Sequence, residues 1–194
     1  MTYLILGLVI FLGVHSVRIV ADGGRTQMLA RVGEGAYKGI YSLLSLLGFG
    51  LIIWGFGIAR ETPVMLWMPP VGMRHAASLL TLIAFILLAA AYVPGNAIKA
   101  RVHHPMVLGV KTWALAHLLA NGSVAHVVLF GSFLLWAVLN FIASRRRDRA
   151  QGTQYPAGTT AGTVTTVVVG VVAWGVFAFL LHGLLIGIRP IPGL

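Results

Sequence analysis

Long apolar segments, separated by short polar ones, make up most of this chain. Each is close to the ~20 residues that an α-helix needs to cross the hydrocarbon core of a bilayer. The six segments are Thr2–Ala21, Gly39–Ile58, His75–Val93, His104–Ala120, Ala125–Ala143 and Val164–Ile188. Apolar runs of this length predict transmembrane helices. We therefore expect an all-α fold, a polytopic membrane helical bundle with about six transmembrane helices, forming a single domain over residues 1–194.

Three polar gaps between these segments predict different structures. Residues 22–38 hold apolar side chains at near-helical spacing, which favours a short amphipathic helix on the membrane surface after the first transmembrane helix. Residues 60–72 hold three prolines beside Trp67, which is typical of a constrained interfacial loop. Residues 144–163 are rich in arginine and then in glycine and threonine, so we expect a flexible loop there.

The composition also indicates a membrane protein. Hydrophobic residues make up 58% of the chain and charged residues only 9%, whereas about a quarter of the residues of a soluble domain are charged. The formal net charge of +10 would suggest nucleic acid in a soluble protein. Here the basic residues lie beside apolar spans, where they set topology, so we expect a lipid bilayer and no nucleic acid as partner. The absence of cysteine excludes disulfides, thiolate ligands and cysteine nucleophiles.

The basic residues are distributed unequally between the connections. With six crossings, the first, third and fifth connections share one side of the membrane. They hold Arg18, Arg25, Arg31, Lys38, Lys99, Arg101, Arg145, Arg146, Arg147 and Arg149, and the other side holds Arg60, Arg74 and Arg189. By the positive-inside rule the side with more basic residues is cytoplasmic, which places both termini outside. The N-terminal apolar run lacks a basic region and a cleavage site, so we expect it to be retained.

Two histidines inside apolar segments are candidate metal ligands. His117 lies deep in the fourth segment and His15 in the first. Burying an ionisable group in a membrane costs on the order of a few kcal/mol, so such residues are usually functional. Imidazoles from two helices can hold a haem from both faces. The alternative is that each histidine only hydrogen-bonds a neighbouring helix. Because the two segments run in opposite directions, the depths of these histidines could differ by ~10 Å.

Residues around His117 could complete a cofactor site. Trp113 and Asn121 lie four residues on either side of it, on the same helix face. Trp113 could stack on a planar cofactor, and Asn121 could supply a hydrogen bond. Both positions also have structural explanations, since a tryptophan at this spacing often serves packing and Asn121-Gly122 can end a helix.

Further polar residues are candidates for the same site. Lys111 and Arg18 could pair with carboxylates such as haem propionates. His104 is a third candidate, although it could also lie among lipid headgroups, and Pro105 after it suits the first turn of a helix. The other histidines that could form a pair, in the outer half of the bundle, are His126 and His182.

Signatures of soluble enzymes are missing from the sequence. It has no phosphate-binding glycine loop, no H-E-x-x-H motif and no nucleophile elbow. All acidic residues are expected in loops, which excludes a carboxylate pair within the membrane; they are Asp22, Glu34, Glu61 and Asp148. Four glycines on the second helix predict close helix packing; they are Gly48, Gly50, Gly55 and Gly57.

The run from His104 to Gly122, HPMVLGVKTWALAHLLANG, resembles the signature of the NnrU family. The early GVHS at residues 13–16 and the six-span layout are similar too, so the resemblance covers essentially the whole chain. It implies a bacterial inner-membrane protein associated with denitrification and nitrogen-oxide metabolism. With the orientation expected above, both termini are periplasmic.

The NnrU family is in turn similar to cis-zeta-carotene isomerase, a membrane enzyme of plants and cyanobacteria that uses haem b. This similarity implies that the proposed haem ligands of the isomerase fall on His15 and His117, and the histidine of its H-P pair on His104. The isomerase has a cysteine three residues before its second histidine, where this chain has Ala114. A cysteine-for-histidine ligand exchange is therefore impossible here.

Three functions remain open on this evidence. The first is a haem b membrane protein in redox or nitrogen-oxide metabolism, with nitric oxide as a candidate ligand. The second is a haem-dependent cis–trans isomerase of a carotenoid-like polyene, with a hydrophobic small molecule as substrate. The third is a membrane interaction or assembly protein without a cofactor. We favour the first.

Overall fold

Helices and short connections form the whole of the part of the chain described by the computed structural model, residues 1–190. The helices are α1 (Thr2–Val20), α2 (Asp22–Val32), α3 (Glu34–Glu61), α4 (Gly72–Tyr92), α5 (Ala97–Val102), α6 (Pro105–Ala120), α7 (Val124–Gln151), α8 (Thr160–Val176), a π-helical turn (Phe177–Leu181) and α9 (His182–Ile186). Within these residues, extended pairing is confined to two isolated bridges, Met65 with Ser123 and Asn96 with Thr159. The all-α prediction is confirmed.

Five helical elements are long and apolar enough to cross a membrane. They are α1, α3, α4, α7 and the continuous element from Thr160 to Ile186. The fourth predicted segment forms α6, whose 16 residues extend for about 24 Å. This helix is shorter than the others, but it packs between α4 and α7. The protein is therefore a multi-pass membrane protein, with all six predicted apolar segments helical.

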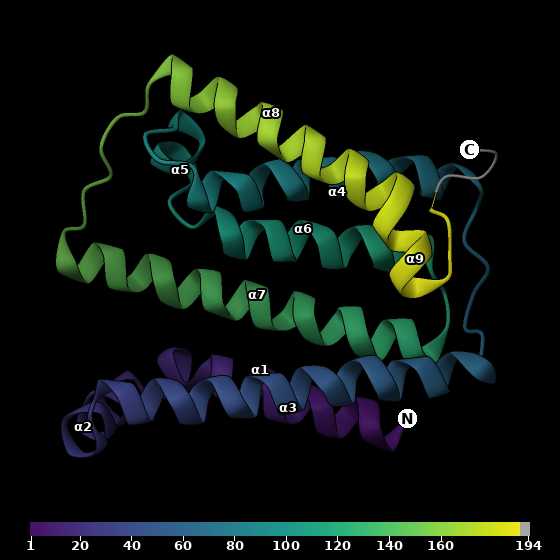
Figure 1. Cartoon of the computed structure of the whole chain (residues 1–194), viewed down its shortest axis with the longest axis horizontal. Coiled ribbons are helices and arrows are strands. Elements are labelled where there is room, and N and C mark those ends of the chain that lie inside the picture. The colour runs from purple at the N-terminus through teal and green to yellow at the C-terminus, as the bar shows by residue number, and fades with distance from the viewer. Residues whose placement is uncertain (191–194) are drawn as a thin grey trace.

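Helix α7 lies at the centre of the bundle (Figure 1). The α1–α3 pair packs against it on one side and α6 on the other, with α4 and then α8 beyond α6. Helices α1 and α6 each contact α7 but do not pack directly on each other. The short helices α2 and α5 and the α7–α8 connection lie at one end of the bundle, which we call the basic end. The N-terminus and α9 lie toward the other end, the opposite end.

Glycines bring the backbones of α1 and α3 into contact. A Cβ atom on Gly48 would lie 2.8 Å from the backbone nitrogen of Phe11, and one on Gly55 would meet the backbone of Leu4. Gly50 and Gly57 face open space instead. The predicted close packing is therefore correct for two of the four glycines, those that lie on the face of α3 toward α1.

The predicted loop over residues 144–163 is too long at both ends. Helix α7 continues to Gln151 and α8 begins at Thr160, so the non-helical connection is limited to residues 152–159. Asp148 accordingly lies in a helix and not in a loop, and the remaining acidic residues stand at helix ends, namely Asp22, Glu34 and Glu61. Arginine, alanine and glutamine have high helix propensity, so the helix continues beyond the apolar segment.

The proline-rich loop after α3 closes the opposite end of the bundle. The backbone nitrogens of Leu66 and Trp67 both donate to the carbonyl of Gly122, at 2.8 and 3.2 Å. The nitrogen of Val124 donates to the carbonyl of Val64 at 2.9 Å. A Cβ atom on Gly122 would collide with the Trp67 carbonyl, so only glycine fits this contact. The loop is therefore fixed on the turn between α6 and α7.

Candidate functional site

His117 lies in the last turn of α6, with its ring held by the same helix. Its Nδ1 donates to the backbone carbonyl of Trp113 at 2.9 Å. The ring is stacked on Phe130 of α7, with 4.5 Å between ring centroids. The Asn121 amide donates to the carbonyl of His117 at 2.9 Å. Asn121 therefore caps the end of α6, where the sequence allowed either a cap or a cofactor contact.

His15 is held in the same way on α1. Its Nδ1 donates to the carbonyl of Phe11 at 2.6 Å, and the two rings are stacked with centroids 4.2 Å apart. Tyr41 of α3 lies 5.2 Å from the imidazole, and Trp136 of α7 lies edge-on to it at 6.2 Å. The indole nitrogen of Trp136 is buried and has no hydrogen-bond partner among the described residues. A polar group without an acceptor thus lies beside His15.

Aromatic rings separate the two candidate ligands. Phe133 of α7 lies 5.9 Å from Phe11 and 5.6 Å from Trp113, so one ring from each of three helices fills the space. His15 lies beside Trp136 of α7 and His117 beside Phe130 of α7. Those two α7 positions are six residues apart, or about 9 Å along the helix axis. The sequence-based expectation of unequal depth agrees with this placement.

A second group of polar residues lies near His117 at the opposite end. The Nδ1 atom of His126 is hydrogen-bonded to the Ser123 hydroxyl at 2.6 Å. Its ring lies 6.0 Å from Phe130 and 5.2 Å from Phe56. The guanidinium of Arg60 lies over the Phe56 ring, 5.6 Å from its centroid. His182, the other candidate at this end, donates from Nδ1 to the Ile188 carbonyl at 2.6 Å.

The two cationic candidates have other partners in this structure. The ammonium group of Lys111 lies 5.6 Å above the ring of Phe141 on α7, a cation–π geometry. Arg18 forms an ion pair with Asp22 at 3.7 Å, and its side chain is 60% exposed. Both residues lie toward the basic end of their helices, with Arg18 at the end of α1 and Lys111 in the first half of α6.

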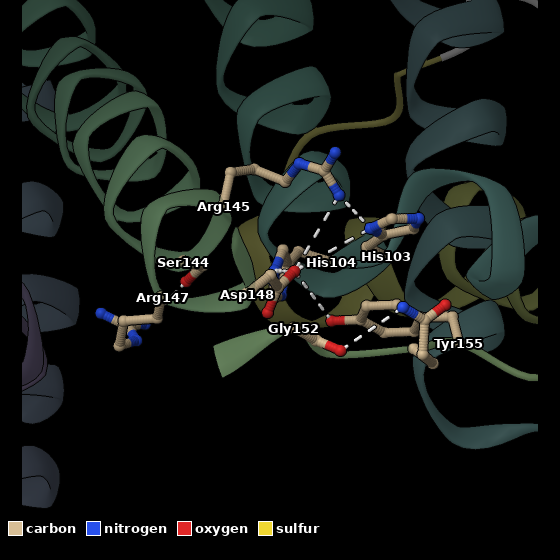
Figure 2. A network of polar contacts seen from close by, with 9 residues as sticks. His103, His104, Ser144, Arg145, Arg147, Asp148, Gly152 and Tyr155 are labelled. Atoms are coloured by element: carbon tan, nitrogen blue, oxygen red, sulfur yellow. Dashed lines mark hydrogen bonds and ion pairs between the residues drawn. The ribbon is translucent and has the colours of Figure 1, made fainter. Parts of the chain in front are cut away.

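His104 belongs to a polar network at the basic end (Figure 2). It precedes Pro105, which begins α6 as predicted. Its Nε2 donates to the Asp148 carboxylate of α7 at 2.8 Å, and the Tyr155 hydroxyl donates to the same oxygen at 3.1 Å. Arg145 lies 3.9 Å from that oxygen. One carboxylate therefore joins the start of α6, the end of α7 and the connection to α8.

The residue before His104 has a strained backbone. His103 has φ 67° and ψ −48°, and the nitrogen of His104 donates to the Val102 carbonyl at 2.8 Å. This is a γ-turn of the rare positive-φ kind. The His103 ring is stacked on Tyr155 at 4.1 Å, and Arg145 donates to its Nδ1. The network thus holds the tight turn between α5 and α6 in place.

Burial and the neighbouring Asp148 carboxylate raise the pKa of the Tyr155 hydroxyl, so it remains a hydrogen-bond donor. Sequence reasoning did not find this network, because its members are far apart in the chain. One signal was present: Asp148 is the single acidic residue within the arginine-rich run 145–149.

Within residues 1–190, no three histidine or acidic side chains are grouped so that they could hold a metal ion. Any metal chemistry in this part of the chain would therefore rest on fewer side-chain ligands, as in a haem held by one or two histidines.

Comparison with known proteins identifies the family. The family model described as NnrU protein matches residues 3–190. The chain belongs to the NnrU family. The matched region of this NnrU chain includes His15, His117 and the basic-end network. No curated protein matches it. No solved structure matches it either.

Proposed function

We propose that this member of the NnrU family binds haem b between α1 and α6 and acts in redox metabolism of nitrogen oxides. His15 and His117 are the residues that would hold it. The observation that carries the proposal is that each imidazole donates Nδ1–H to a carbonyl of its own helix. This bond fixes the tautomer of the ring. It leaves the lone pair of Nε2 free to bind iron. No described group hydrogen-bonds either Nε2 atom.

The surroundings of these histidines are aromatic and apolar. Phe11, Trp113 and Phe133 supply apolar ring surfaces between α1, α6 and α7. The unpaired indole N–H of Trp136 would gain an acceptor from a propionate or another oxygen of the bound group. Binding requires the three rings to turn aside, because they fill the space between the imidazoles.

Other residues have defined parts in this proposal. Lys111 and Arg18 remain candidate partners for propionates, and each would exchange its present partner for a stronger one. Asn121 and His104 fix the two ends of α6 and so orient His117. When bound, the haem would supply one-electron redox chemistry and an iron site for a small ligand such as nitric oxide. The nitrogen-oxide role rests on the family resemblance.

The charge distribution supports an orientation in the bacterial inner membrane. The helix ends and connections at the basic end hold ten of the arginines and lysines, against three at the opposite end. By the positive-inside rule we assign the basic end to the cytoplasm and both termini to the periplasm.

The test is a visible spectrum of the protein purified in mild detergent with haem, oxidised and after dithionite reduction. The wild type should show a Soret band that shifts on reduction. His117→Ala should lose haem, and His15→Ala should bind less haem with an altered spectrum. His75→Ala is the matched control, because His75 is exposed at the start of α4.

The outcomes separate the parts of the proposal. A wild-type protein that takes up no haem would exclude haem binding altogether. Unchanged spectra in both histidine variants would retain the haem but exclude these two ligands. Loss of haem in the His75→Ala control as well would point to general unfolding, which the detergent-extracted yield and circular dichroism of each variant would reveal.

A further inference from the structure

A surface cavity of about 250 Å³ lies between α2 and α3 at the basic end of the bundle. It is lined by one apolar side chain, one aromatic ring and three charged side chains, namely Leu29, Tyr37, Arg25, Glu34 and Lys38. Pockets for drug-sized ligands begin at roughly 300 Å³. The cavity therefore suits a small polar group better than a large cofactor.

The charges in this cavity are of both signs. Lys38 and Glu34 form an ion pair at 2.6 Å, one turn apart on α3, and their side chains are 71% and 73% exposed. Arg25 lies over the ring of Tyr37 at 5.7 Å, and within residues 1–190 its guanidinium has no hydrogen bond or ion pair. Lys38 occupies only one of the roughly four lone-pair sites of the Glu34 carboxylate. The cavity thus offers a cation without an anion and a carboxylate that can accept further hydrogen bonds.

Gly33 sets the angle between the two helices that form the cavity. Its φ of 81° and ψ of 160° lie in a region that is essentially confined to glycine. The Gly33 nitrogen donates to the carbonyl of Leu29 at 3.0 Å, and the Tyr37 nitrogen donates to the carbonyl of Gly33 at 3.1 Å. The turn therefore joins the two walls of the cavity, and its geometry can be changed without changing any lining charge.

The cavity lies just outside the apolar part of the bundle. On α3 its lining residues all precede Gly39, where an uncharged run begins that continues to residue 59. Helix α2 exposes Met28 and Val32, as expected of a helix that lies on a membrane surface. Both observations place the cavity at the depth of the lipid headgroups, which border the hydrocarbon core. Headgroups are therefore the polar groups most abundant beside it.

We propose that this cavity binds the headgroup of a phosphatidylethanolamine molecule from the adjacent leaflet. The phosphodiester, with its single negative charge, pairs with Arg25, and the ammonium group donates to the Glu34 carboxylate. The acyl chains follow the exposed apolar side chains at the start of the membrane-spanning part of α3, beginning with Ile40 and Leu43. This site goes beyond the proposed function and does not depend on haem.

Other common headgroups match the cavity less well. An anionic headgroup such as phosphatidylglycerol has a partner in Arg25 but brings no cation to Glu34. A choline headgroup has the right charges, but its ammonium is fully methylated and has no N–H to donate. Phosphatidylethanolamine supplies both an anion and a hydrogen-bonding cation, so it satisfies both side chains. The three lipids therefore separate the two contacts.

The experiment uses the full-length protein, purified and delipidated in mild detergent. An equimolar mixture of dioleoyl phosphatidylethanolamine, phosphatidylcholine and phosphatidylglycerol is added, and the bound lipids are identified by native mass spectrometry. The wild type should retain phosphatidylethanolamine over phosphatidylcholine by about three- to fivefold, the effect of one exposed ion pair. Soluble glycerophosphoethanolamine, added in excess, should not displace it, because it lacks the acyl chains.

Four variants locate the binding site. Arg25→Gln should weaken retention of all three lipids, because each has a phosphodiester. Glu34→Gln should remove most of the preference for phosphatidylethanolamine over phosphatidylcholine. Gly33→Ala should weaken phosphatidylethanolamine retention although every charge remains, because it shifts α2 relative to α3. Arg31→Gln is the matched control, since it removes one positive charge from the same helix outside the cavity, and it should bind as the wild type does.

Each contrary outcome overturns a defined part of the proposal. A wild type that retains phosphatidylcholine as well as phosphatidylethanolamine would exclude the contact with Glu34. Stronger retention of phosphatidylglycerol would make the cavity a simple anion site. Displacement by glycerophosphoethanolamine would exclude a lipid as the ligand. An unchanged preference in both Arg25→Gln and Glu34→Gln would place the lipid elsewhere, and an equal loss in Arg31→Gln would reduce the effect to surface charge.

Discussion

Histidines at the basic end and histidines inside the bundle are held by different kinds of partner. At the basic end, His104 donates to the Asp148 carboxylate and His103 accepts from Arg145, so both imidazoles bond side chains of another helix. Inside the bundle, His15 and His117 bond only to carbonyls one turn earlier in their own helices. Their remaining contacts are with aromatic rings.

The difference shows what each pair can do. An imidazole bonded across helices holds those helices together, and its nitrogen is used by that bond. An imidazole bonded to its own helix makes no hydrogen bond between helices, and its Nε2 remains available for a ligand. Histidine alone therefore did not distinguish a structural role from a binding role in this chain. The partner of each ring nitrogen did.

The largest expected effect on stability is at Asp148. Asp148→Ala leaves His104, Tyr155 and Arg145 without their shared acceptor, and should lower the free energy of unfolding by about 1–2 kcal/mol. The effect is measured by SDS titration in mixed micelles. Asp22→Ala, which breaks only the exposed pair with Arg18, should cost at most about 0.5 kcal/mol. If the two variants lost the same unfolding free energy, the network would have no structural role.

A smaller, pH-dependent effect on the free energy of unfolding is expected from substitution of Tyr155. The pKa of its hydroxyl is raised above the ordinary value of 10.0, so its stabilising contribution is present below about pH 10 and lost as the pH rises through the folded-state value. Tyr155→Phe should cost about 0.5–1 kcal/mol at neutral pH, with the half-exposed site at the low end of that range.

The measurement for Tyr155 is the difference in unfolding free energy between wild type and variant, at neutral pH and at about pH 11. The difference should shrink at the higher pH, since only the wild type carries an ionising hydroxyl there. A difference that stays constant would mean that the bond to Asp148 contributes nothing and that the ring stacking on His103 accounts for the whole effect.

The smallest effect is expected inside the bundle in the absence of haem. His117→Phe replaces an imidazole with an apolar ring of similar size among Trp113 and Phe130, and should change the stability of the haem-free protein less than either variant above. The same variant should abolish stabilisation by added haem. Unfolding measured with and without haem tests both statements. A large loss in the haem-free protein would make His117 a structural residue.

The sequence was sufficient for the apolar helices but not for where each helix ends. Hydropathy shows where an apolar segment ends, but not where its helix ends. Residues 144–151 are polar, so the sequence predicted a loop there. Arginine, alanine and glutamine nevertheless continue the helix of α7 into water. The same limitation concealed the Asp148–His104 pair, because the partners are 44 residues apart and meet only through the packing of α6 on α7.

The glycines of α3 illustrate a second limit. Gly48 and Gly50 look equivalent in the sequence, yet one lies against the backbone of Phe11 and the other faces open space. Which face of a helix is covered depends on its partner helix, and an apolar helix in lipid shows little amphipathic contrast that would indicate it. For the candidate site, the residues His15, His117 and Trp113 followed from the sequence. The unpaired Trp136 indole needed the structure.

The glycine contact between α1 and α3 also has a consequence for the order of assembly. It involves only the first 61 residues, so this hairpin can pair while the rest of the chain is still being synthesised. His15 is then already fixed in a finished hairpin before α6 enters the bilayer. Any group bound by both His15 and His117 must therefore be captured late, when the second half of the protein docks onto the first.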